Sequence, residues 1–341
     1  MSFTELLANE KTDYLIVATQ IAGPRKLFAA LELFAFADKS AATVIVSIDL
    51  DTLAAEIVYE IDGETADYRY VDGWHGLVQA KRVIELEGGT PRVTKTRLAG
   101  EEEACHAIAR HDGKTFVAGT KQSPSCKYVI DGFVAEVTGG KLAIRVETSQ
   151  LPNVEEGHLD VLCAGSRGLH ASGSAMTSAP KDDDREGIVI DLEGKTPTLR
   201  TCIMPIYALH ETASGDLLLG SDKRASVIGK ATRTFDVPSQ VRAVTEFRGT
   251  AYFASHNHKG STLHVYRGTS KGAEPAWKAK FQWIGYRSRG GRRDLKMCAS
   301  ADLLVVSNET RLHIYDGKKW SQLAVTREPG KLVKRMPVGM K

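Results

Sequence analysis

Short β-like runs separated by tight-turn dipeptides recur along almost the whole chain, and this recurrence limits the folds available to it. Asp-Gly readily adopts the positive φ angles of a hairpin turn, so each such pair is a candidate strand-to-strand connection. Helical periodicity is almost absent, with only residues 2–8 and 24–36 ambiguous. We therefore expect an all-β chain. The Asp-Gly pairs begin at Asp62, Asp72, Asp112, Asp131 and Asp316.

A longer unit repeats on top of this pattern. It consists of an apolar strand, a turn of small residues, a second apolar strand that ends in small residues, and then a longer hairpin. That makes four strands per unit, at a spacing of roughly 35 to 55 residues. Residues 14–61 and 67–98 form two earlier units that match the pattern less well. The clearest copies begin at Cys105, His158, Tyr207, Val241 and Leu295.

Segments such as SGDLLLGS (residues 214–221) and LHIYDGKKW (residues 312–320) resemble units of β-propeller repeat proteins in general. The sequence lacks the Trp-Asp dipeptide of WD40 repeats and the double-glycine pattern of kelch repeats, so it indicates no particular family. The resemblance implies an all-β single propeller of seven blades, each with four antiparallel strands, and six blades is the alternative count. A large β-sandwich or two stacked barrels is the competing interpretation.

The expected domain organisation has three parts. Residues 1–12 form an N-terminal extension and residues 13–326 the propeller. Residues 327–341 form a basic tail that is either disordered or supplies a strand closing the ring against the first blade.

The bulk composition predicts a globular cytoplasmic protein. Of the 341 residues, 42% are hydrophobic and 26% charged, and the net charge of +3 is too small to favour nucleic acid as a partner. No signal peptide or membrane-length apolar stretch is recognisable. The five cysteines are scattered without Cys-x-x-Cys spacing, which indicates reduced thiols. We expect no metal and no cofactor.

Propeller geometry predicts where a binding site lies. Residues just after the second strand of each blade crowd one mouth of the central channel, where loops on a rigid scaffold carry binding residues. His256 and His258 share a face if they lie on a strand, which makes a metal site a minor alternative. The predicted mouth residues are Lys121, Asp222, Lys223, Arg224, His256, His258, Asn308 and Glu309.

The segment Gly285–Arg293 is the densest basic stretch of the chain. Arginine forks between glycines suit a phosphate or carboxylate, and Tyr286 adds an aromatic face. We expect this segment to extend the binding rim through Tyr286, Arg287, Arg289, Arg292 and Arg293. Trp74 is expected as an exposed aromatic in a connection.

The sequence contains no recognisable catalytic set. The Gly-Lys-Thr triplets at 113–115 and 194–196 lack the earlier glycine of a phosphate-binding loop, and there is no Gly-x-Ser-x-Gly nucleophile elbow. The leading hypothesis is a non-enzymatic propeller that binds a protein or an anionic ligand, with an acidic partner favoured. The alternatives are a hydrolase or lactonase with a site at the channel mouth and, less favoured, a nucleic-acid binder.

Overall fold

The computed structural model of the chain describes residues 12–35, 40–96, 104–122, 130–177, 186–193, 197–202, 204–257, 262–280, 295–326 and 333–336. They form seven antiparallel sheets whose strands follow one another in chain order. Six sheets have four strands, and the seventh has four plus one added at its edge. The protein is a single seven-bladed β-propeller, as the repeat predicts.

The first compact unit contains residues 1–65 and 245–341. Its blade 1 consists of β1 (Thr12–Gly23), β2 (Lys26–Ala35), β3 (Ser40–Asp49) and β4 (Ala55–Asp62). Blade 6 consists of β21 (Val241–Phe247), through which the division between the units passes, β22 (Thr250–Asn257), β23 (Thr262–Thr269) and β24 (Gly272–Lys280). Blade 7 consists of β25 (Lys296–Ala299), β26 (Leu304–Ser307), β27 (Arg311–Tyr315), β28 (Trp320–Val325) and β29 (Val333–Met336).

The second unit, residues 66–244, contains blades 2 to 5. Blade 2 consists of β5 (Asp67–Val71), β6 (Trp74–Gln79), β7 (Arg82–Glu87) and β8 (Thr90–Lys95). Blade 3 consists of β9 (Ala104–His111), β10 (Lys114–Gln122), β11 (Ile130–Thr138) and β12 (Lys141–Glu147), and the short 3-10 helix η1 (Thr148–Gln150) follows it. Blade 4 consists of β13 (Val154–Gly165), β14 (Gly168–Thr177), β15 (Glu186–Asp191) and β16 (Thr198–Cys202). Blade 5 consists of β17 (Ala208–Glu211), β18 (Leu217–Ser221), β19 (Arg224–Ile228) and β20 (Arg233–Asp236).

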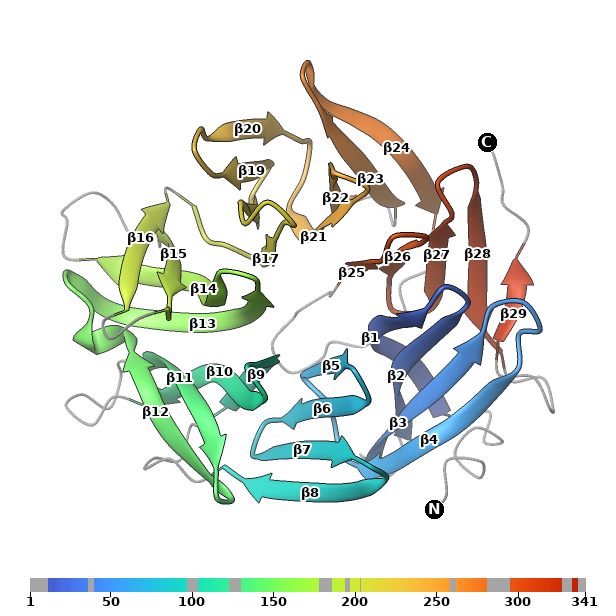
Figure 1. Ribbon diagram of the computed structural model, residues 1–341, viewed down its shortest axis with the longest axis horizontal. Helices are drawn as coiled ribbons and strands as arrows, with labels where there is room; N and C mark the ends of the chain where they lie inside the picture. The colour runs from blue at the N-terminus through green and yellow to red at the C-terminus, as the bar shows by residue number, and fades with distance from the viewer. Residues whose placement is uncertain are drawn as a thin grey trace. The chain divides into compact units, whose positions relative to one another are not determined.

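Within this second unit the blades share one orientation. The first strands, β5, β9, β13 and β17, lie along one side of the unit, and the fourth strands lie along the opposite side (Figure 1). Apolar side chains fill the space between neighbouring sheets; Leu159 and Leu169 of blade 4, for example, pack with Val134 of blade 3. This packing therefore fixes how neighbouring blades of the second unit are placed, and with it the geometry of any site between them.

Two features of the repeat have direct structural causes. The Asp112-Gly113 turn has φ angles of 48° and 72°, as a tight hairpin between β9 and β10 requires. In blade 4 a small residue late in the second strand allows a close approach by the first strand: a Cβ at Gly173 would overlap the carbonyl oxygen of His158. Both the turn and the small residues are thus requirements of the blade itself.

One local expectation was wrong. Asp131-Gly132 is not a hairpin turn but lies inside β11, where Asp131 accepts hydrogen bonds from Thr148 and Ser149. Residues 26–35 of the ambiguous segment 24–36 form β2. In blade 7 the segment 333–336 pairs with β28 of the same sheet. The proposed domain limits remain predictions.

Candidate functional site

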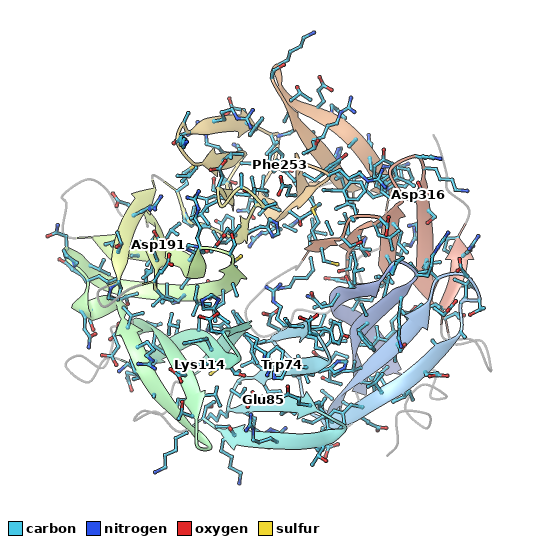
Figure 2. The ribbon with its side chains drawn as sticks, viewed as in Figure 1. Trp74, Glu85, Lys114, Asp191, Phe253 and Asp316 are labelled. Atoms are coloured by element: carbon cyan, nitrogen blue, oxygen red, sulfur yellow. The ribbon has the colours of Figure 1, made fainter. Side chains whose placement is uncertain are left out.

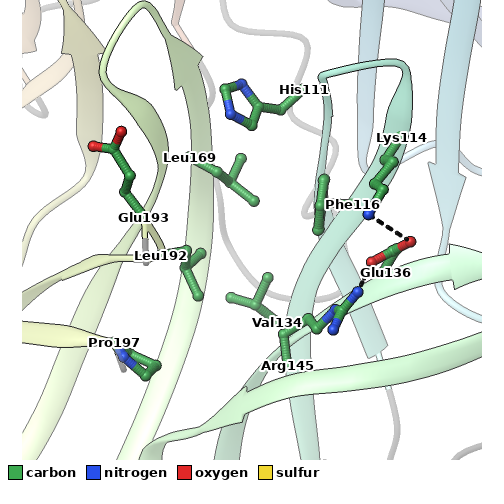
Figure 3. Close-up of a pocket in the computed structure, with 10 residues that line it drawn as sticks. All are labelled: His111, Lys114, Phe116, Val134, Glu136, Arg145, Leu169, Leu192, Glu193 and Pro197. Carbon is green, nitrogen blue, oxygen red and sulfur yellow. Dashed lines mark hydrogen bonds and ion pairs between the residues drawn. The ribbon is translucent and has the colours of Figure 1, made fainter. Parts of the chain in front are cut away.

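A groove of about 290 Å³ lies between blades 3 and 4 of the second unit (Figure 3). Its floor is apolar, and charged side chains stand on both walls. The lining residues are His111, Lys114, Phe116, Val134, Glu136, Arg145, Leu169, Leu192, Glu193 and Pro197.

Strand alternation builds the wall that blade 3 contributes. Lys114 and Phe116 are two residues apart on β10 and therefore share a face. Glu136 is the cross-strand partner of Phe116, which brings its carboxylate onto that same face. On β12 Arg145 lies at a β-bulge opposite Val134, and its guanidinium donates a hydrogen bond to Glu136.

Glu136 is the electrostatic centre of this wall. Arg145 donates a hydrogen bond to its Oε2, and the Lys114 ammonium lies 3.6 Å from its Oε1 (Figure 3). The hydrogen bond from Arg145 is the largest contribution that holds the pKa of Glu136 below its ordinary value, against the opposing effect of burial. The Lys114 and Arg145 side chains are 56% and 51% exposed, so two cations surround one ionised carboxylate and still face solvent.

The opposite wall belongs to blade 4. Leu169 begins β14, whereas Leu192 and Glu193 directly follow β15 (Figure 3). Glu193 is exposed and carries the negative charge of this wall. The groove therefore combines an apolar floor with one wall of net positive charge and one acidic wall. It can hold an apolar group that is flanked by charged groups.

A second cluster joins blades 4 and 5. His170 places Nδ1 2.6 Å from Asp191 and Nε2 2.9 Å from Glu211. Ser166 and the backbone N–H of Arg167 also donate to Glu211, each at 2.8 Å. Although burial opposes ionisation, these hydrogen bonds hold the pKa of Glu211 below its usual range. Because the hydroxyl of Ser166 is directed to Glu211 and not to His170, this cluster has the bonding of a structural network rather than of a paired nucleophile and base.

The predicted mouth residues in the second unit lie where their second strands end. Lys121 is buried near the end of β10 and forms an ion pair with Glu147. Asp222 and Lys223 form the turn between β18 and β19, and Arg224 lies 3.5 Å from Asp236. Both of these ion pairs form within a single blade.

In the first unit the described predicted residues lie near or just after the ends of second strands. His256 is fully buried in β22. Asn308 is buried after β26, and its Oδ1 accepts the backbone N–H groups of Thr310 and Arg311, so it shapes the turn into β27. The backbone carbonyl of Glu309 accepts the N–H of Ile16. The remaining predicted residues, His258, Tyr286, Arg287, Arg289, Arg292 and Arg293, lie outside the described residues.

Trp74 is not the exposed loop aromatic that the sequence suggests. It is 1% exposed in β6, and its indole N–H donates to Glu85 at 3.3 Å (Figure 2). Conversely, no sequence signal indicates the groove. Its charged residues on blade 3 lie on ordinary strand positions, and the bulge at Arg145 has no local sequence signal.

Among the residues that the structure describes, no group of three or more His, Cys, Asp or Glu side chains could hold a metal ion. In the same part of the chain no helix is long and apolar enough to span a membrane.

Comparison with known proteins supports the fold. No protein-family model matches the chain, and no curated protein matches its sequence. The β-propeller domain of the Trilobed protease from Pyrococcus furiosus is similar with a TM-score of 0.58 and 12% identity, covering 94% of this chain and 97% of that one. The WD40 domain of Pan2 from Neurospora crassa is similar with a TM-score of 0.56 and 11% identity, covering 89% and 90%.

The acylaminoacyl peptidase of Pyrococcus horikoshii is also similar, with a TM-score of 0.58 and 10% identity over 89% of this chain. The match covers 51% of the peptidase, so this chain corresponds to about half of its length. At such identities the likeness establishes the propeller fold alone.

Proposed function

We propose that this chain is a non-enzymatic interaction propeller that binds a short segment of another protein in the groove between blades 3 and 4. The observation that carries the proposal is the arrangement around Glu136, where Lys114 and Arg145 flank an apolar floor while half of each side chain faces solvent. WD40-type propellers and the propellers of peptidases share the fold, so the fold supports an interaction role without requiring one.

The chemistry of the groove favours an apolar side chain next to an acidic one in the partner. Lysine and arginine each carry several N–H donors. Glu136 interacts with only some of the N–H donors of Lys114 and Arg145. A partner carboxylate would complete their bonding, while an apolar neighbour would cover Phe116 and Leu169. Ligand pockets start at a volume of about 300 Å³, so the groove lies at the lower end of their range. A groove of this size suits part of a peptide better than a large cofactor.

The rim predicted from the sequence would provide a second contact area of the same charge preference. Its members Arg287 and Arg289 stay predictions, as does a cytoplasmic location. The free thiols Cys105, Cys163 and Cys298 support a reducing compartment.

Selection from a displayed library of random peptides tests the proposal directly. We expect the enriched peptides to share an apolar residue beside Asp or Glu. The variant Arg145→Glu should then bind these peptides at least about tenfold more weakly, because a charge-assisted hydrogen bond is replaced by repulsion. Arg92→Glu is the matched control, since Arg92 also lies on a fourth strand and pairs with a buried glutamate, Glu85, at 3.1 Å.

Equal binding by the wild type and Arg145→Glu would reject the groove as the site. Loss of binding on changing Arg287 and Arg289 to Glu, with Arg145→Glu unaffected, would assign the interaction to the predicted rim instead. Cleavage of the selected peptides by the purified protein would favour the hydrolase alternative.

A further inference from the structure

Blade 7 differs from the other blades in having a fifth strand. The segment β29 pairs antiparallel with the outer edge of β28, with Val333 opposite Val325 and Met336 opposite Gln322. An outer strand otherwise presents unpaired backbone N–H and C=O groups to solvent. The chain therefore covers this edge with its own C-terminal segment.

The strand that is covered is the one that lacks the usual protection of an edge. Natural edges are protected from pairing by charges, proline or bulges. β28 has the sequence Trp-Ser-Gln-Leu-Ala-Val, without a charge or a proline, and its pairing with β27 has an unbroken register. The fourth strands of blades 1 to 6 all contain charged residues, β8 and β24 contain a proline, and β4, β12 and β24 have a bulge.

β29 is held both by side-chain contacts and by backbone pairing. Val333 is 2% exposed and packs into the core shared by blades 1 and 7. Arg335 donates to the carbonyl oxygen of Leu50 in blade 1 at 3.4 Å. The other contribution comes from the backbone pairing along β28, which is independent of side-chain identity. Such a segment can be exchanged as a unit.

We propose that the outer edge of β28 is a strand-docking site, that β29 occupies it within the chain, and that β29 of a second copy can occupy it when the chain's own strand is released. A second copy is the favoured occupant because its segment reproduces every contact, the apolar anchor Val333 and the Arg335–Leu50 bond included. β28 ends at Val325 and β29 begins at Val333, so seven residues of sequence separate the two strands.

Binding of a peptide in trans tests the docking site. A labelled synthetic peptide of residues 331–338 is titrated into the full chain and into the variant Val333→Asp, which places a charge in the core position and releases β29. Val93→Asp is the matched control, because Val93 is a valine on a fourth strand that is 49% exposed. We expect Val333→Asp to bind the peptide at least about tenfold more tightly than the wild type, in which the tethered strand competes at a millimolar effective concentration.

A peptide of the same composition in scrambled order should not bind. If Val333→Asp retains its circular dichroism spectrum and binds neither peptide, or binds both equally, the proposal is overturned.

A disulfide trap tests the exchange without a destabilised variant. Ala324 and Lys334 are register partners across β28 and β29. Chains carrying Ala324→Cys alone and Lys334→Cys alone are unfolded, mixed and refolded together at high concentration under mild oxidation. We expect a covalent dimer linked through positions 324 and 334, identified by peptide mapping. Complete refolding to monomers without this linkage would reject the second copy as the occupant.

Discussion

The indole N–H of Trp277 donates to Nδ1 of His313 across 3.2 Å, from blade 6 to blade 7 of the first unit. An Nδ1 that accepts a hydrogen bond carries no proton, so the imidazole is neutral with its proton on Nε2. His313 is fully buried. This burial, reinforced by the charge of Arg311, lowers the pKa of His313 to about 3.

The first prediction concerns stability in mild acid. The unfolded chain protonates this histidine near its ordinary pKa of about 6.5, whereas the folded chain does not until about pH 3, so the unfolded state binds more protons in between. We expect the free energy of unfolding to fall by about 3 kcal/mol between pH 6.5 and 4 from this group alone. Urea unfolding across that range measures the slope.

His313→Gln should remove this part of the slope, because glutamine can accept the bond from Trp277 but does not titrate. His111→Gln, at a partly exposed histidine, is the control for replacing a histidine by glutamine. Equal slopes in the wild type and His313→Gln would show that His313 takes up its proton over the same pH range in the folded and the unfolded chain.

The second prediction has the opposite sign. Glu32 is 4% exposed, and burial, with the nearby Glu64 charge, raises its pKa to about 8 despite the hydrogen bond from the N–H of Thr65. The unfolded state therefore binds fewer protons between about pH 4.5 and 8, and stability falls as pH rises through that window. Glu32→Gln keeps an acceptor for Thr65 and should be more stable than the wild type by up to about 4 kcal/mol at pH 8.

At pH 4.5 the two proteins should unfold at similar urea concentrations. Glu56→Gln, at an exposed position of β4, is the control and should follow the wild type at both pH values. A Glu32→Gln variant less stable than the wild type at pH 8 would mean that Glu32 is ionised and favourably paired in the fold.

The blade architecture was accessible from the sequence because its determinants are local. The Asp112-Gly113 turn and the small residues around Gly173 each satisfy a backbone requirement within one blade, and such requirements recur with the repeat. The interpretation of Asp131-Gly132 as a turn was wrong because a non-local interaction decides the structure there. The dipeptide permits a turn, but the pairing of β11 with both neighbouring strands keeps it in an extended strand.

The candidate site was not accessible because it arises between blades. Arg145 and Glu136 lie on different strands, and Leu192 lines the groove only when blade 4 packs on blade 3. The exposure of Trp74 was misjudged for a similar reason, because its hydrogen-bond partner lies on another strand. Trp74 follows a turn in sequence, yet Glu85 from the next strand satisfies its N–H and allows it to be buried.

The third prediction concerns the cluster around Glu211. Its carboxylate accepts from His170, Ser166 and the N–H of Arg167, and its side chain is fully buried. Glu211→Gln removes the charge that faces His170 and leaves buried donors imperfectly paired, so we expect a loss of about 2–4 kcal/mol in the free energy of unfolding. Because the pKa of Glu211 is lowered in the fold, the difference should shrink as pH falls below its ordinary value.

Urea unfolding at pH 7 and at acid pH measures both effects. Glu193→Gln, at an exposed carboxylate on the groove wall, should change stability by less than about 0.5 kcal/mol. A Glu211→Gln variant as stable as the wild type at pH 7 would show that the cluster contributes no net stability.

The fourth prediction tests the physical basis of the repeat. Gly173 lies on β14 opposite Leu159, where the pairing with β13 shifts register. A Cβ there would overlap the carbonyl oxygen of His158, and a backbone atom cannot swing away as a side chain can. Gly173→Ala should therefore destabilise the protein by about 1–3 kcal/mol, although alanine is ordinarily the better strand residue of the two.

Gly23→Ala is the matched control, since nothing lies within 4 Å of a Cβ at Gly23 and the change should stay within about 0.5 kcal/mol. Thermal unfolding of both variants decides the matter: equal melting temperatures would mean that the small residues of the second strands are not needed for close strand approach.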